Sequence, residues 1–134
     1  MKQSGAPLQG KRILIIEDMP ENLRLLRAIL RLEDVVVLEA ERAATGIELA
    51  RHELPDLILM DMQMPEMDGL TATKILRADP QTQHIPIVIV TASAMPDDRR
   101  RAFAAGCSGY ITKPIDPVSM IEQLNAFFPD TPTP

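Results

Sequence analysis

The sequence has few residues that could cross-link the chain or hold zinc. Its 134 residues include one cysteine, Cys107, and two histidines, His52 and His84. A single cysteine cannot form an internal disulfide, and these three residues do not have the spacing of a zinc site. The composition excludes a disulfide scaffold and is typical of a reducing compartment, so we predict a cytoplasmic protein.

Long apolar runs and an excess of positive charge are also absent. The longest apolar stretches, such as Ile13–Ile16 and Ile85–Val90, are far too short to cross a bilayer, and the N-terminus lacks the apolar core of a signal peptide. The net charge of −5 offers no positive field for nucleic acid or anionic lipid. We therefore predict neither membrane insertion nor direct nucleic-acid binding.

Hydrophobic residues make up 46% of the chain, which is enough for one compact domain and too little for two. The first ten residues are mostly polar, and the last residues, FPDTPTP, have no periodicity and little to bury. We predict a flexible segment over residues 1–10, a single domain over residues 11–128 and a disordered tail over residues 129–134.

Short apolar runs rich in β-branched residues recur along this domain. They cover Ile13–Ile16, Val35–Leu38, Leu57–Met60, Ile87–Val90 and Tyr110–Thr112. Continuous apolar runs of this length predict strands that are buried on both faces.

Helical periodicity fills the segments that follow these strands. The apolar positions are Leu23, Leu26 and Leu30; Ala43, Ile47 and Ala50; Ala72, Ile75 and Leu76; and Val118, Ile121, Leu124 and Phe128. A fourth helix, Asp97–Ala105, has the weakest pattern, but Pro96 suits its start and Gly106 its end. Five β-α repeats predict an α/β fold with an open parallel sheet and helices on both sides.

Polar side chains follow four of the predicted strands. Glu17 and Asp18 follow the first, Asp61 the third, Thr91 the fourth and Lys113 the fifth. Ligands of open α/β sheets bind beyond the carboxyl ends of the strands, so these five groups should converge. Because neighbouring carboxylates repel one another unless a cation lies among them, and because Mg²⁺ prefers oxygen ligands, the pattern predicts a Mg²⁺ site with room for phosphate.

Asp61 is the best-placed nucleophile in this group. A carboxylate can accept a phosphoryl group as an acyl phosphate while a metal neutralises charge on the transferring group. Lys113 could supply a fixed ammonium, and Thr91 a hydroxyl, to the phosphoryl oxygens. The bond between Lys113 and Pro114 can be cis at modest cost.

The motifs IIED, LILMDMQMPEMDG, IVTASA and GYITKP, in this order and spacing, resemble the bacterial response-regulator receiver domain over residues 11–128. The resemblance implies a doubly wound, flavodoxin-like α/β fold with five parallel strands in the order 2-1-3-4-5. It implies that Asp61 is the phosphoacceptor and that Glu17, Asp18, Asp61 and the backbone carbonyl of Gln63 hold Mg²⁺. Thr91 and Lys113 occupy the positions of the family's hydroxyl and lysine.

In this family the domain takes a phosphoryl group from a sensor histidine kinase or a histidine phosphotransfer protein. Tyr110 occupies the aromatic switch position, and its ring would turn inward as Thr91 moves toward the phosphoryl group. The resemblance implies a changed protein-binding surface on the fourth helix, fifth strand and fifth helix. It implies a switch that assists its own phosphorylation and slow dephosphorylation, at a rate set by Gln63 and Ser93, rather than a turnover enzyme.

The sequence also allows three alternatives to be considered beside this prediction. A metal-dependent phosphohydrolase would place an acid two residues after the nucleophile, where this chain has Gln63. A nucleotide-binding domain would have a glycine-rich motif after the first strand, where this chain has EDMPEN. Within the family, a single-domain regulator and a receiver module of a hybrid histidine kinase both stay open.

The run Arg99–Arg101 is interpreted as a solvated helix face.

Overall fold

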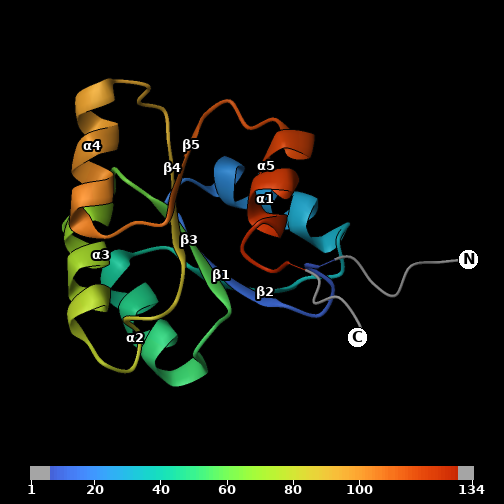
Figure 1. Cartoon of the computed structure of the whole chain (residues 1–134), viewed down its shortest axis with the longest axis horizontal. Helices are drawn as coiled ribbons and strands as arrows, with labels where there is room; N and C mark the ends of the chain where they lie inside the picture. The colour runs from blue at the N-terminus through green and yellow to red at the C-terminus, as the bar shows by residue number, and fades with distance from the viewer. Residues whose placement is uncertain (1–6, 130–134) are drawn as a thin grey trace, which may run out of the picture.

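The computed structural model describes residues 7–129, in which five strands and five helices alternate along the chain (Figure 1). The strands are β1 (Arg12–Ile16), β2 (Val36–Ala40), β3 (Leu57–Asp61), β4 (Ile87–Thr91) and β5 (Gly109–Thr112). The helices are α1 (Pro20–Arg31), α2 (Ala43–Glu53), α3 (Gly69–Ala78), α4 (Pro96–Ala105) and α5 (Pro117–Asn125). None of the helices in the described part is long and apolar enough to cross a membrane.

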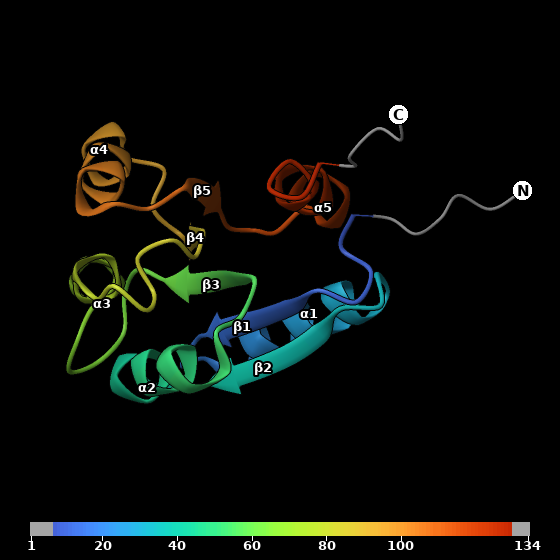
Figure 2. The same ribbon diagram turned by 60° about the horizontal axis from the view of Figure 1, so that its bottom comes forward.

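All strand pairs are parallel, and the sheet has the order β2-β1-β3-β4-β5. The chain begins at β1, crosses to β2 and returns past β1 to β3, so the direction of winding reverses between β1 and β3. Figure 2 shows the strands as one layer with helices on either side. The predicted fold class and strand order are confirmed.

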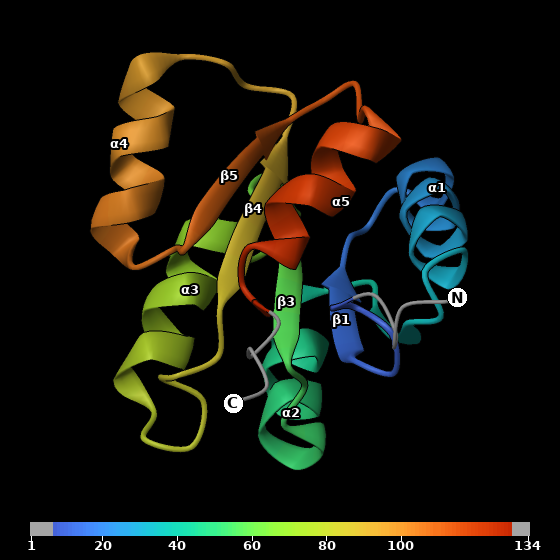
Figure 3. The same cartoon turned by 45° about the vertical axis from the view of Figure 1, so that its right-hand side comes forward.

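Alternating side chains of the central strands build two separate cores. Ile13, Ile15 and Leu59 point to the side covered by α1 and α5, whereas Leu14 and Ile58 point to the side covered by α2, α3 and α4. Figure 3 shows α4 and α5 on opposite sides of β5 accordingly. Strands that bury both faces need apolar residues throughout, which explains the unbroken apolar runs in the sequence.

Three expectations about these elements were wrong. β2 is not buried on both faces, because it is an edge strand and Val36 is 49% exposed. Val118 is 68% exposed and lies outside the core that α5 helps to form. Phe128 follows the end of α5 rather than belonging to it, although its ring still packs against that core.

The residues just before the predicted domain boundary at residue 11 take part in the fold. Leu8 is fully buried in the core beneath α1 and α5, and the Gly10 N–H donates a hydrogen bond to the Asp34 carbonyl at 2.9 Å. The prediction of a flexible segment is therefore wrong for residues 7–10, since burial of Leu8 fixes this turn. Residues 1–6 and 130–134, which belong to the predicted flexible ends, lie outside the described residues.

A single arginine side chain connects the end of α3 with the loop before β4 and with the end of α4. Arg77, at the end of α3, donates to the carbonyl oxygens of Gln83, Ile85 and Gly106 at 3.1, 2.7 and 2.8 Å, and to the Ser108 hydroxyl at 3.1 Å. Gly106 is the left-handed residue that ends α4. One side chain thus joins the end of α3 to the end of α4 and the approach to β5.

We expect Arg77→Met to lower the free energy of unfolding by about 2–4 kcal/mol, because methionine keeps the apolar stem but leaves these acceptors unpaired. Chemical denaturation would measure the change. The matched control is Lys74→Met, one turn earlier on α3 at an exposed position, for which we expect a change within about 0.5 kcal/mol. Equal effects of the two substitutions would contradict the assigned role of Arg77.

Candidate functional site

The carboxyl ends of four parallel strands bring the predicted site residues to one edge of the sheet. Glu17 follows β1 directly, Asp61 and Thr91 are the last residues of β3 and β4, and Lys113 follows β5. Asp61 lies opposite Val90, the neighbour of Thr91. This edge is also where the winding reverses, the usual ligand position in such sheets.

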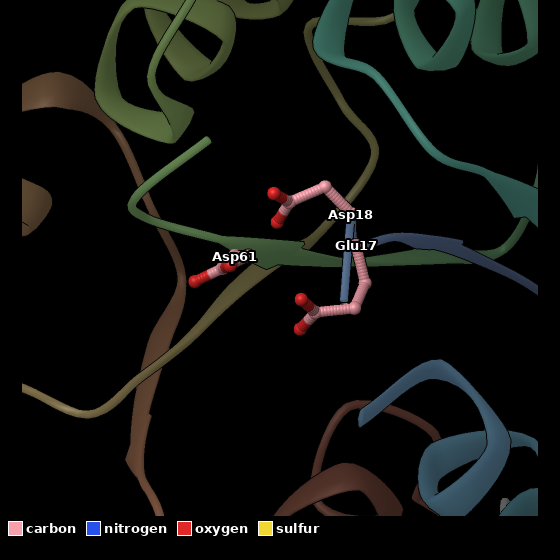
Figure 4. A group of neighbouring side chains, drawn as sticks. All are labelled: Glu17, Asp18 and Asp61. Atoms are coloured by element: carbon pink, nitrogen blue, oxygen red, sulfur yellow. The ribbon is translucent and has the colours of Figure 1, made fainter. Parts of the chain in front are cut away.

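Three carboxylates form a compact group at this edge. One oxygen from each of Glu17, Asp18 and Asp61 lies within 4.8 Å of the others, and Figure 4 shows the three side chains converging from the ends of β1 and β3. Glu17 is only 1% exposed and Asp61 only 6%. Their negative charges are therefore poorly screened by water.

Lys113 brings one positive charge to this group. Its Nζ lies 3.3 Å from Glu17 Oε1 and 3.9 Å from Asp61 Oδ1. The backbone N–H of Lys113 donates to the Thr91 carbonyl at 2.7 Å, and the following bond to Pro114 is cis. A single ammonium does not balance three carboxylates.

The excess of negative charge and the burial of the site change the pKa of Asp61. Burial raises the pKa of Asp61 to about 7, the Glu17 carboxylate adds to the rise, and Lys113 opposes it. A divalent cation among the three carboxylates would favour the charged form and lower this pKa.

The available lone pairs fit such a cation. Asp18 Oδ1 is buried and has no hydrogen-bond partner among the described residues. Glu17 Oε2 accepts from the Met19 N–H at 3.1 Å, and Asp61 Oδ1 accepts from the Gln63 N–H at 3.3 Å, so a backbone N–H orients each of these two carboxylates. Oriented carboxylate oxygens with an unpaired buried acceptor match the ligand chemistry of Mg²⁺.

The loop after β3 depends on a glycine whose role the sequence did not reveal. The Gly69 N–H donates to the Met62 carbonyl at 2.8 Å, and a Cβ at Gly69 would lie 2.2 Å from the Asp61 carbonyl oxygen. In the sequence Gly69 suits only a turn into the helix that follows. Its close approach to the backbone of Asp61 depends on the folded path of the loop, which spacing alone does not define. The Gln63 side chain is exposed.

The side chains of Thr91 and Tyr110 both form hydrogen bonds with the backbone of Ser93. The buried Thr91 hydroxyl accepts from the Ser93 N–H at 3.2 Å, and the Tyr110 hydroxyl donates to the Ser93 carbonyl at 3.0 Å. The Tyr110 ring is only 6% exposed and therefore lies in the inward orientation. Sequence reasoning connected Ser93 only with the lifetime of an acyl phosphate and did not reveal that it joins these two side chains.

Comparisons with known proteins agree on the family and the fold of this chain. Residues 13–125 match the family described as response regulator receiver domain. The polar-differentiation response regulator DivK of Brucella anthropi is 38% identical over 120 residues, which cover 90% of this chain and 98% of that protein.

Two solved structures are similar throughout. The receiver domain of a sensor histidine kinase from Pseudomonas aeruginosa, crystallised with a magnesium ion coordinated in its active-site cleft, has a TM-score of 0.83 at 31% identity and covers 89% of this chain and 98% of that one. The chemotaxis protein CheY4 of Vibrio cholerae has a TM-score of 0.83 at 23% identity, with coverage of 88% and 98%, and supports the fold.

We expect Asp61→Asn to raise the free energy of unfolding by on the order of 2 kcal/mol at about pH 8 without divalent cations, because it removes a buried charge. The folded carboxyl keeps its proton up to about pH 7, whereas the unfolded one loses it near its ordinary pKa of 3.8. The wild type should therefore lose stability relative to the variant as the pH rises through this window.

Denaturation curves at several pH values would measure this difference. Glu122→Gln, at an exposed position on α5, is the control and should show no such trend. A gap between Asp61→Asn and wild type that is the same at pH 4 and pH 8 would show that the charge is not the cause.

Proposed function

Since the chain belongs to the response regulator receiver domain family, we propose that it acts in two-component signalling as a switch controlled by phosphorylation of Asp61. The observation that carries this proposal is the buried position of Asp61 beside the Glu17 and Asp18 carboxylates and 3.9 Å from the Lys113 ammonium. A nucleophile, a cation and a group suited to a metal meet at one strand end, as phosphoryl transfer requires.

In the proposed step a carboxylate oxygen of Asp61 forms a bond to the phosphorus of a phosphohistidine. The P–N bond of the donor breaks, and the leaving imidazole nitrogen keeps the bonding pair and takes up a proton. Lys113 is close enough to Asp61 to pair with a phosphoryl oxygen, and Thr91 carries a hydroxyl at the neighbouring strand end.

We propose Mg²⁺ as the cofactor, held by Glu17, Asp18, Asp61 and the backbone carbonyl of Gln63. Bound there, the metal would neutralise charge on the phosphoryl group. The unpaired Asp18 oxygen supports this assignment, as does the magnesium ion in the similar domain from Pseudomonas aeruginosa.

The proposed donor is a sensor histidine kinase or a histidine phosphotransfer protein, and the proposed output is a changed protein-binding surface on α4, β5 and α5, with Thr91 and Tyr110 as the switch residues. A cytoplasmic location is part of the proposal. The relatives include a response regulator and the receiver domain of a kinase, so the proposal covers a stand-alone regulator and a hybrid-kinase module. A phosphohydrolase is less well supported, because Gln63 occupies the position of its acid.

We expect the protein to gain one phosphoryl group when it is incubated with Mg²⁺ and acetyl phosphate, and Asp61→Asn to abolish the gain. Intact-mass spectrometry would measure it. The control Asp68→Asn retains the cap of α3, where Asp68 accepts from the Thr71 N–H, and should be labelled like the wild type. Equal labelling of Asp61→Asn would refute the acceptor assignment, and repeated turnover of a stable phosphomonoester would favour the phosphohydrolase.

We expect Asp18→Asn to weaken Mg²⁺ binding roughly tenfold or more, because it removes a charged ligand from the group. Calorimetric titration with Mg²⁺ would measure the affinity. The matched control is Asp116→Asn, an exposed position before α5, which should leave the affinity unchanged. An unaltered affinity in Asp18→Asn would rule out the assigned metal ligand.

A further inference from the structure

Three consecutive arginines on α4 have different surroundings. Arg100 pairs with Asp97, and Arg101 pairs with Asp98 at 3.0 Å, each with the acid one turn earlier. The residue one turn before Arg99 is Pro96, which offers no charge. The Arg99 guanidinium instead lies over two aromatic rings, 5.2 Å from the centre of Phe103 and 5.6 Å from the centre of Tyr110.

The second of these rings belongs to the residue at the switch position. Tyr110 is anchored at its hydroxyl by the Ser93 carbonyl, and its ring is almost fully buried. Arg99 is itself exposed, so its guanidinium covers the ring from the solvent side. A guanidinium over an aromatic face is attracted by the negative potential of that face and also shields the ring from water.

We propose that Arg99 is a positioning residue that holds the Tyr110 ring in its inward orientation. An outward movement of the ring would give up the contact with Arg99 together with the hydrogen bond to Ser93. The inward ring is therefore favoured before any phosphoryl group is present. This consequence rests on the proposed function: Arg99 sets the fraction of the unphosphorylated protein in which the Tyr110 ring has the inward orientation of the switched state.

The position of Arg99 also connects this cover to the phosphorylation site. The Ser93 hydroxyl donates to Asp98, the neighbour of Arg99, and accepts from the Met95 N–H at 3.2 Å. The Ser93 backbone in turn contacts the Thr91 hydroxyl. A shift of Thr91 toward Asp61 would thus act on the first turn of α4, which carries Arg99.

The composition of the chain makes this proposal directly measurable. It contains one tyrosine and no tryptophan, so intrinsic fluorescence reports on Tyr110 alone. Acrylamide, a neutral quencher, would measure exposure of the ring in the full chain without Mg²⁺ or phosphodonor. We expect Arg99→Ala to shift the balance toward the outward ring by roughly two- to fivefold and so to increase quenching, and Arg99→Lys to restore much of the protection.

The matched control is Arg100→Ala, which removes a positive charge from the same helix but leaves the contact between Arg99 and the Tyr110 ring. Its fluorescence should be quenched like that of the wild type. Far-UV circular dichroism would verify that each variant is folded. Equal quenching of Arg99→Ala and wild type, or an equal increase in Arg100→Ala, would overturn the proposal.

A second arm adds Mg²⁺ and acetyl phosphate and separates this proposal from the proposed function. We expect phosphorylation to return the quenching of Arg99→Ala toward the wild-type value, which would support both. If the wild type gains no phosphoryl group, the proposed function fails, while the donor-free arm still decides whether Arg99 covers Tyr110. If Arg99→Ala is phosphorylated and its quenching does not fall, the link between Arg99 and the switch is overturned.

Discussion

The repulsion among three carboxylates at one sheet edge is the constraint on which the site depends. The fold holds three carboxylates together, those of Glu17, Asp18 and Asp61. It does so because the apolar strands that precede them are buried on both faces and end at the same edge of the sheet. The hydrophobic cores thus hold in place an arrangement that is electrostatically unfavourable by itself, with Lys113 as a partial counter-charge. A site built in this way responds strongly to a cation or a phosphoryl group, because either one changes an unbalanced charge in surroundings of low dielectric.

The parts of the fold that could be predicted from sequence are those in which a local pattern reflects tertiary burial. The central strands β1, β3 and β4 are apolar at every position except one end residue, so their positions were predicted to within one residue. β2 lies at the edge, where one neighbour is missing, and its apolar residues do not indicate full burial. Leu8 is a single apolar residue without periodicity, so no pattern could indicate that it belongs to the core.

The site, like the fold, has features that the sequence predicts and features that only the structure shows. Parallel strands put their carboxyl ends together, so Glu17, Asp61 and Lys113 can be grouped from the sequence alone. The approach of Gly69 to Asp61 and the meeting of Thr91 and Tyr110 at Ser93 depend on loop paths that spacing does not define. The arginine run shows the same limit, because two of its members pair along the helix as a solvated face would, and only tertiary structure places Arg99 over a ring from another element.

The two ends of α4 are held in unequal ways, which bears on how a signal would travel. Its last turn is tied through Gly106 to Arg77, which also holds backbone carbonyls of the loop before β4. Its first turn has no side-chain cap at Met95 and is joined to the loop after β4 through the Ser93 hydroxyl and Asp98. Because that loop follows Thr91, whose strand ends beside the carboxylates, a change of charge at Asp61 would act on the less constrained end of the helix, where Arg99 and Tyr110 meet.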